Sequence, residues 1–241
     1  MLKALMAGLL AIVVLSNSAL ASTIPHTAIL QAENLSVYIT ADISEMTYGD
    51  NINEADAVKE IKDRAICSGS ILASRGTEEI ILTARHCTEG DETLYGRTDV
   101  TPRTVHFFNG DIGKVEAVKR DPKLDVALLL VHSMRAHKEH DELYSKVTPG
   151  ESLFLYGMPD GYFWSFSDMT SMNGTMENNI RLSMTDAFDF MQLSCAACYG
   201  GNSGGAVFNA KGQVVGIMNA KGPNSMWMTS ASRIKNMIHN M

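Results

Sequence analysis

The feature that most constrains the fold is a long succession of short apolar or alternating runs, each ended by turn residues. Alternation favours a strand, because successive side chains along a strand point to opposite faces of a sheet. Residues 109–111, Asn-Gly-Asp, lie between two such runs and are a strong hairpin signal. Many short strands joined by turns are typical of an all-β barrel or sandwich. The strand candidates are residues 35–39, 69–73, 79–83, 105–108, 112–118, 126–131, 152–156, 162–166, 180–184, 191–194, 205–208, 214–218 and 226–229.

Two stretches have helical rather than strand-like spacing. Residues 53–64 carry apolar side chains three residues apart, which indicates a short surface helix. Near the C-terminal end a serine, Ser230 or Ser232, can cap a short helix. The apolar stripe of that second helix consists of Ile234, Met237 and Ile238.

The N-terminal stretch has the pattern of a secretory signal peptide. Lys3 supplies a positive charge, residues 4–15 are apolar, and residues 19–21, Ala-Leu-Ala, provide small residues for cleavage. The apolar run is short for a membrane span, which needs about 20 residues. We therefore expect a signal peptide over residues 1–21 and a secreted or periplasmic mature chain over 22–241, with no stable membrane span. An uncleaved anchor is the alternative.

Composition is compatible with one well-packed domain or two subdomains. Apolar residues make up 45% of the 241 residues, which is enough for a proper core. The formal net charge is −7, so we expect neither nucleic-acid binding nor a polybasic membrane surface.

In the oxidising compartment of an exported chain, an even number of cysteines, here four, indicates disulfides rather than free thiols. Cys67 and Cys87 flank a predicted hairpin, and Cys195 and Cys198 lie three residues apart, so these two pairs are the simplest of three pairings. So short a loop between Cys195 and Cys198 demands special backbone geometry. A four-cysteine zinc site and a redox-active Cys-x-x-Cys are the alternatives.

Three side chains form a set that is suited to nucleophilic catalysis. Ser203 stands in the glycine-rich run 200–205, where glycines allow positive φ and can turn backbone amides toward one point. His86 follows a predicted strand, and Asp125 directly precedes the wholly apolar run 126–131. A carboxylate at the start of such a buried strand needs a partner that compensates for its lost hydration. An imidazole oriented by a carboxylate can in turn activate a serine.

In their order and context these stretches resemble the chymotrypsin-fold (trypsin-like) serine proteases. The resembling stretches are 83–87 around His86, 125–129 beginning at Asp125, and 201–205 around Ser203. Residues 149–161 and 212–217 resemble strands of the bacterial Deg/Htr-type branch, although we expect no PDZ domain of the kind that branch usually adds. Three motifs together are far more specific than any one of them.

The resemblance implies two antiparallel six-stranded β-barrels with the active site between them. The first barrel, with an N-terminal extension, would take residues 22–140, and the second barrel and the C-terminal helix residues 141–241. Ser203 would be the nucleophile, His86 the general base and Asp125 the orienting carboxylate, with the amides of Gly201 and Ser203 as oxyanion hole. The expected activity is that of a serine endopeptidase acting on protein or peptide substrates, with no cofactor and no metal.

Two positions depart from the trypsin pattern. Trypsins have an aspartate just before the serine, which pairs with a newly cut N-terminus, but here Asn202 takes that place, as in the bacterial branch. Six residues before the serine, Ala197 replaces the acid that selects Lys or Arg substrates. With Cys198 beside it, Ala197 favours small or medium apolar side chains before the cut.

Other interpretations carry less weight. A catalytically inactive peptide-binding homologue and an esterase-like acyl hydrolase are the alternative functions. The histidines 132, 137 and 140 fit a solvated connector better than a metal site, and the acids 89, 91 and 92 fit an acidic surface loop better than a calcium site. Asp160 or Asp186 could replace Asp125, but neither precedes so apolar a strand.

Overall fold

The computed structural model describes most of the chain after the N-terminal stretch. The predicted signal peptide lies outside the described residues, as do Ala197, Asp91, His140, Asp160 and Asp186. Among the described residues no helix has the length and apolarity needed to span a membrane. The described residues are 24–48, 55–90, 92–93, 96–121, 123–137, 143–144, 146–158, 165–171, 177–181, 187–195, 198–222 and 225–240.

The first sheet is antiparallel and closes on itself. Its order is β1-β2-β3-β7-β6-β5-β4, and β1 also pairs with β5, so that six strands form a closed barrel. The apolar strand β7 lies between β3 and β6. The strands are β1 (Ser36–Tyr48), β2 (Ala55–Arg75), β3 (Glu78–Thr83), β4 (Glu92–Thr93), β5 (Gly96–Phe107), β6 (Ile112–Asp121) and β7 (Val126–His132).

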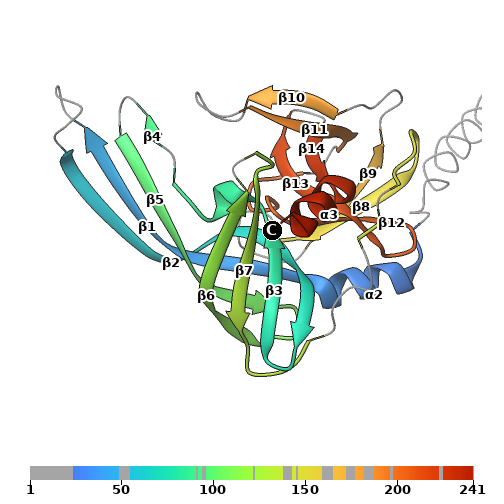
Figure 1. Ribbon diagram of the computed structural model, residues 1–241, viewed down its shortest axis with the longest axis horizontal. Coiled ribbons are helices and arrows are strands. Elements are labelled where there is room, and N and C mark those ends of the chain that lie inside the picture. The colour runs from blue at the N-terminus through green and yellow to red at the C-terminus, as the bar shows by residue number, and fades with distance from the viewer. Residues whose placement is uncertain are drawn as a thin grey trace, which may run out of the picture.

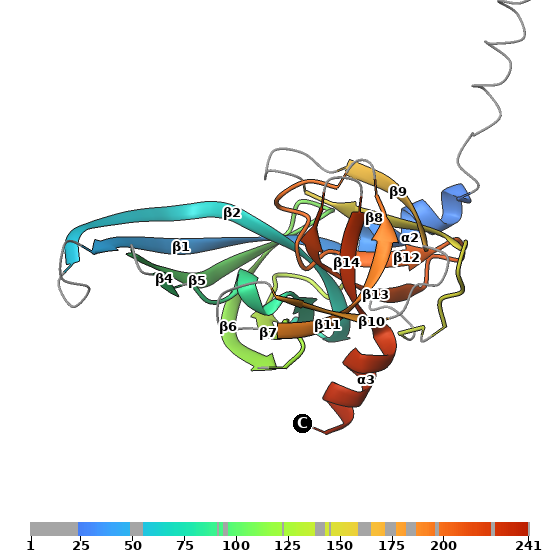
Figure 2. The ribbon, with the colours of Figure 1, turned by 90° about the horizontal axis from the view of Figure 1, so that it is seen from above.

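The strands β1, β2 and β5 continue past the barrel as an arm, which projects to the left in Figures 1 and 2. In the arm β1 pairs with β2 on one side and with β5 on the other, for example Ile43 with Ile61 and with Val100. The prediction of a helix over 53–64 is therefore wrong, because β2 begins at Ala55. Pairing with β1 overrides the weak helical spacing, as tertiary context commonly does.

The second sheet has the order β10-β11-β14-β13-β12-β8-β9. A short contact joins β11 to β9 through Leu193 with Ser171 and Ser194 with Thr170. The all-β fold and one closed six-stranded barrel are thus confirmed, and the completeness of the second barrel stays a prediction. The strands are β8 (Ser152–Gly157), β9 (Ser165–Ser171), β10 (Glu177–Arg181), β11 (Ala187–Ser194), β12 (Ala206–Asn209), β13 (Val214–Lys221) and β14 (Ser225–Ser230).

Two α-helices border the sheets in the part of the chain that the structure describes. The helix α3 (Ala231–His239) confirms the predicted C-terminal helix; it buries Ala231, Ile234 and Met237, whereas Ile238 is exposed. The helix α2 (His26–Leu35) was not expected, since its buried face consists largely of alanines, which carry a weak hydrophobic signal.

One apolar core joins the two sheets beneath the site. Leu82 of β3 and Val126 of β7 belong to the same buried cluster as Phe154 of β8 and Ile217 of β13. The first barrel and the second sheet each have a separate core of their own as well. Because interiors are closely packed, this shared core holds the ends of β3, β7 and β13 in a defined arrangement.

His137 differs from the expected solvated connector. Its side chain is only 7% exposed and lies between two carboxylates, with Nδ1 3.1 Å from Oε1 of Glu79 and Nε2 3.5 Å from Oδ2 of Asp111. The ring also stacks on Phe107, with centroids 3.7 Å apart. The expectation was wrong for this residue, because buried carboxylates need a partner and the segment after β7 folds back to supply one. His132 is exposed, as expected.

Candidate active site

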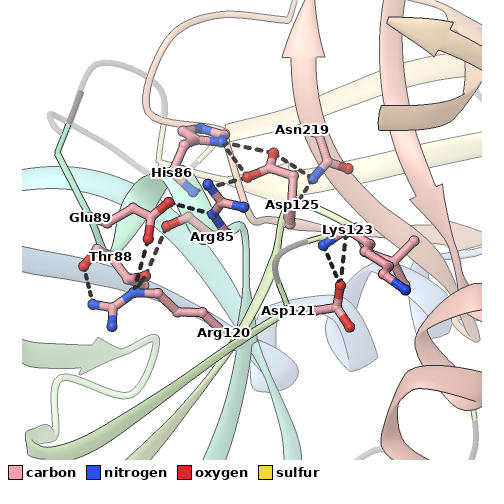
Figure 3. A network of polar contacts seen from close by, with 10 residues as sticks. Arg85, His86, Thr88, Glu89, Arg120, Asp121, Lys123, Asp125 and Asn219 are labelled. Atoms are coloured by element: carbon pink, nitrogen blue, oxygen red, sulfur yellow. Dashed lines mark hydrogen bonds and ion pairs between the residues drawn. The ribbon is translucent and has the colours of Figure 1, made fainter. Parts of the chain in front are cut away.

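His86 and Asp125 are brought together from two neighbouring strands of the first barrel. The strand β3 leads into the short 3₁₀ helix η1 (Arg85–Cys87), and β7 begins directly after Asp125. Nδ1 of His86 lies 2.9 Å from Oδ2 and 3.2 Å from Oδ1 of Asp125, and the main-chain amide of His86 donates to Oδ1 at 2.9 Å (Figure 3). The carboxylate therefore fixes both the ring and the backbone of His86.

Asp125 is held in a demanding conformation. Its side chain is 2% exposed, and its φ of 40° is the one positive value among the described non-glycine residues. Positive φ is tolerated by aspartate better than by most residues and is concentrated at functional sites. The backbone is thus set so that a buried carboxylate meets an imidazole that is 41% exposed.

Asn219 supports the carboxylate from the second sheet (Figure 3). Its Nδ2 donates to Oδ2 of Asp125 at 2.9 Å and to the Asp125 carbonyl oxygen at 2.8 Å, while its Oδ1 accepts from the Thr229 amide at 2.7 Å. All three groups of this buried side chain are satisfied. Sequence reasoning missed Asn219; the available signal was a polar amide that directly follows the apolar run 214–218.

An ionic cluster flanks His86 on the side away from Asn219 (Figure 3). Glu89 forms an ion pair with Arg85, and its other oxygen lies 3.6 Å from Nε of Arg120. Nε of Arg120 also donates to Oγ1 of Thr88 at 2.8 Å. Glu89, which follows the histidine turn, therefore has basic partners within the protein.

The expected disulfides are present, and one of them lies next to candidate site residues. Cys67 is bonded to Cys87 and Cys195 to Cys198, which is the simplest of the three pairings considered. The first bond ties η1 to β2, and Sγ of Cys87 lies 3.6 Å from the carbonyl oxygen of Ser203. His86 lies close to the sulfurs of Cys67 and Cys87, but sulfurs within a disulfide are not thiolate ligands. The zinc and dithiol alternatives are excluded for this oxidised form.

The glycines of the serine turn are required by its geometry. Gly201 and Gly204 have φ of 83° and 79°. A Cβ on Gly204 would lie 2.1 Å from Oγ1 of Thr83 and 2.7 Å from the amide nitrogen of Ala84. The turn is therefore packed directly against the chain that enters η1. This close approach places Ser203 beside the His86 segment, although the sequence separates them by more than a hundred residues.

Ser68 of β2 clamps the serine turn to the first barrel. Its main-chain amide donates to the carbonyl oxygen of Ser203 at 2.8 Å, and its Oγ donates to that of Gly201 at 2.9 Å. The same Oγ accepts from the Met158 amide at 3.0 Å. Sequence reasoning missed this residue, since only the folded chain brings β2 to the turn.

The backbone of the turn leaves two amides unused. Among the described residues neither the Gly201 nor the Ser203 amide donates a hydrogen bond to another protein group, whereas the Gly204 amide donates to the Met218 carbonyl at 2.7 Å. In the same part of the chain the side chains of Ser203 and His86 do not exchange a hydrogen bond. Free amides beside a serine can receive an oxyanion.

Asn202 is fully buried behind the turn. Its side-chain oxygen and nitrogen have no hydrogen-bond partner among the described residues. A Cβ on Gly157 would lie 2.8 Å from that oxygen, so the amide is packed against β8. The Asn202 side chain therefore packs inside the protein and does not face solvent from the turn.

The arrangement of a histidine–aspartate pair beside a glycine-rich serine turn has relatives. A family model described as a trypsin-like peptidase domain matches residues 67–217, more than half of the chain. The chain belongs to the trypsin-like peptidase domain family. The match begins at Cys67 and ends at Ile217, so it includes His86, Asp125 and Ser203.

Curated relatives of this family member are longer than the chain. Serine protease Do-like HtrB of Bacillus subtilis (strain 168) is 28% identical over 157 residues, which is 64% of this chain and 32% of that protein. Serine protease HTRA3 of Rattus norvegicus is 28% identical over 160 residues, with the same coverage of 64% and 32%. The chain thus spans about a third of the length of the curated relatives it matches.

Solved structures show the same fold at low sequence identity. A mutant of Rv3671c from M. tuberculosis H37Rv in its inactive form has a TM-score of 0.63 and 14% identity, covering 90% of this chain and 91% of the other. The HtrA-type protease AlgW with a decapeptide has a TM-score of 0.64 and 17% identity, covering 89% and 66%. These likenesses support the trypsin-like fold of this family member.

Proposed function

We propose that the chain is a serine endopeptidase that hydrolyses peptide bonds through an acyl-enzyme intermediate. The observation that carries this proposal is the Asp125 carboxylate 2.9 Å from Nδ1 of His86, next to the glycine-rich turn that holds Ser203. A carboxylate on Nδ1 keeps the proton on that nitrogen, so Nε2 is left to accept a proton. Ser203 is then the nucleophile, His86 the general base and then acid, and Asp125 the orienting carboxylate.

The chemistry of the proposed reaction follows from these positions. His86 takes the Ser203 proton as the hydroxyl attacks the scissile carbonyl, and the oxyanion is received by the Gly201 and Ser203 amides. His86 then protonates the leaving amine, and water releases the acyl group by the reverse path. The free state of both amides in the described part of the chain supports this assignment. None of these steps draws on a metal or a cofactor.

The substrates we propose are proteins or peptides. The support is family membership together with the AlgW structure, which holds a decapeptide. A net charge of −7 gives no support to nucleic-acid binding.

The proposed location is outside the cytoplasm, either secreted or periplasmic. Two disulfides support an oxidising compartment. We infer a signal peptide over residues 1–21 and a peptidase domain over 22–241, divided near residue 140 between its two barrels. We also infer that the second sheet is a full six-stranded barrel, for which the short contact between β11 and β9 is the support.

A fluorophosphonate probe tests the nucleophile directly. The wild-type chain should be labelled once and should cleave an unfolded protein, whereas Ser203→Ala should lose the label and about 10⁶-fold of turnover. Ser152→Ala, a half-buried serine on β8, is the matched control and should keep both. Peptide binding without labelling or cleavage would favour the inactive homologue, and hydrolysis of esters alone would favour the acyl hydrolase.

A further inference from the structure

The strand that carries Asn219 ends in a lysine that the polar network around Asp125 does not use. Lys221 is exposed, and its Nζ lies 5.9 Å from the centroid of the Tyr199 ring. Tyr199 is itself 49% exposed and stands four residues before Ser203. An ammonium over an aromatic face is attracted by the ring quadrupole, which restricts where the charge can lie. The contact thus joins the segment entering the serine turn to the segment leaving Asn219.

The main chain beside this contact has an open edge. The pairing of β13 with β12 extends from Val214 to Ile217, and the serine turn then occupies that side, with the Met218 amide donating to the Gly205 carbonyl at 2.9 Å. Beyond this point Ala220 pairs with Trp227 of β14 on the other side and Lys221 with Met226, while Asn219 lies at the register shift between Met218 and Ala220. Among the described residues no strand pairs with 219–221 on the side of the serine turn. An extended peptide can add to such an edge.

The charge at this edge is positive, although the chain as a whole is negative. Within the described part of the chain no carboxylate lies within ion-pair distance of Lys221. The nearby carboxylate of Asp125 is buried and already bound by His86 and Asn219. Lys221 therefore presents an unneutralised, aromatically held ammonium to whatever lies along the edge.

We propose that Lys221 and Tyr199 form a subsite that selects substrates with an aspartate or glutamate side chain near the scissile bond. The inference rests on the proposed peptidase function and adds a substrate class to it. Lys221 lies two residues beyond Asn219, which is about 6–7 Å along a strand. An extended peptide that lies along β13 advances by the same distance per residue. Counted from the level of Asn219, the selected carboxylate therefore lies about two residues from the bond that is cut. This leaves room for an apolar side chain at the bond itself.

Paired peptides that differ by one charge measure the subsite. One peptide carries Asp and the other Asn two residues from the cleaved bond, on either side in turn, and the quantity compared is the ratio of their kcat/KM values. The wild-type chain should prefer the Asp peptide by about three- to tenfold, as expected for a partly exposed charge pair, and the preference should shrink in high salt. Lys221→Gln should bring the ratio to about one. Lys221→Glu should bring it below one and should favour a third peptide that carries Lys at the same position.

Two further variants separate the charge from the ring and from general effects. Tyr199→Phe should keep the ratio, since phenylalanine also presents an aromatic face, and Tyr199→Leu should lower it. Lys211→Gln removes another exposed lysine, from the turn between β12 and β13, and should leave the ratio at the wild-type value. Both peptides cleaved at equal rates by the wild-type chain, or an Asp preference that persists in Lys221→Gln, overturns the subsite alone. Failure to cleave any peptide or to react with fluorophosphonate overturns the peptidase proposal beneath it.

Discussion

Replacing Asn219 with alanine tests whether the second sheet supports the histidine–aspartate pair. The change deletes an amide that makes three hydrogen bonds of 2.7 to 2.9 Å, two to Asp125 and one from the Thr229 main chain. It leaves the contacts between Asp125 and His86 in place. The variant therefore perturbs the support of the carboxylate rather than the reacting groups.

The magnitude follows from what each lost bond does. The bond to the Asp125 carboxylate involves a charged acceptor and contributes about 1.5–3 kcal/mol. If this support is needed when His86 becomes an imidazolium, kcat falls about 10- to 150-fold, since each 1.36 kcal/mol is a factor of ten. The Asp125 carbonyl and the Thr229 amide are also left unsatisfied, at about 1–3 kcal/mol each. The free energy of unfolding should therefore fall by about 3 kcal/mol or more.

The assay must separate lost activity from lost folded protein. Fluorophosphonate titration counts competent sites, so kcat is expressed per labelled serine, and urea unfolding measures stability in parallel. Asn209→Ala is the matched control, because Asn209 is a buried asparagine of the same sheet. Among the described residues its side chain bonds only the turn at 211–213. It should lose stability and keep kcat per site.

A kcat per labelled site within twofold of wild type for Asn219→Ala would refute the reasoning. The same conclusion would follow if Asn209→Ala lowered kcat per site equally, because the effect would then be one of general stability. Asn219→Asp offers a second measurement. It places a negative charge against the Asp125 carboxylate and should reduce activity at least as much as alanine.

Three further predictions concern the frame around the site. The double variant Cys67→Ser/Cys87→Ser opens a loop with a sequence separation of 20 and should lose about 3 kcal/mol in urea unfolding; an unchanged midpoint would contradict this. Gly204→Ala places a Cβ 2.1 Å from Oγ1 of Thr83 at a φ of 79°. The purified variant should therefore show little fluorophosphonate labelling. Near-wild-type labelling would argue against the close packing of the turn. Burial, followed by the nearby Glu33 carboxylate, raises the pKa of Tyr156 to about 12. The free energy of unfolding should therefore decline as pH rises from about 10 through 12, and this group should not affect it below that window. A Tyr156→Phe difference titration at the phenolate absorbance band checks the value.

The candidate site residues that sequence reasoning predicted are those with local signals. His86 follows a strand of apolar alternation, Asp125 precedes an apolar run, and Ser203 is surrounded by glycines. Each signal depends on residues within a few positions, where strand periodicity and turn chemistry are legible. The ordering of these three along the chain then allowed the fold and the family to be predicted.

The residues that sequence reasoning missed act across long separations. Asn219 meets Asp125 from 94 positions away, and Ser68 meets Gly201 from 133. His137 was expected in solvent, but it is buried between the carboxylates of Glu79 and Asp111. A polar side chain in a loop or strand shows no periodicity that reveals its partner, so these contacts could not be predicted.

The sequence by itself determined the all-β architecture, the C-terminal helix and the candidate chemistry, because each rests on periodicity, spacing or local backbone preference. It favoured the observed disulfide pairs only as the simplest of three pairings. Only the tertiary structure decided that residues 55–64 extend a strand of the arm, and that Ser68 and Asn219 hold the two halves of the site together. It also placed Lys221 over Tyr199, at an edge of β13 that no strand pairs among the described residues. The physical reason is that these features depend on which distant segments share a packed interface, and that choice belongs to the whole chain.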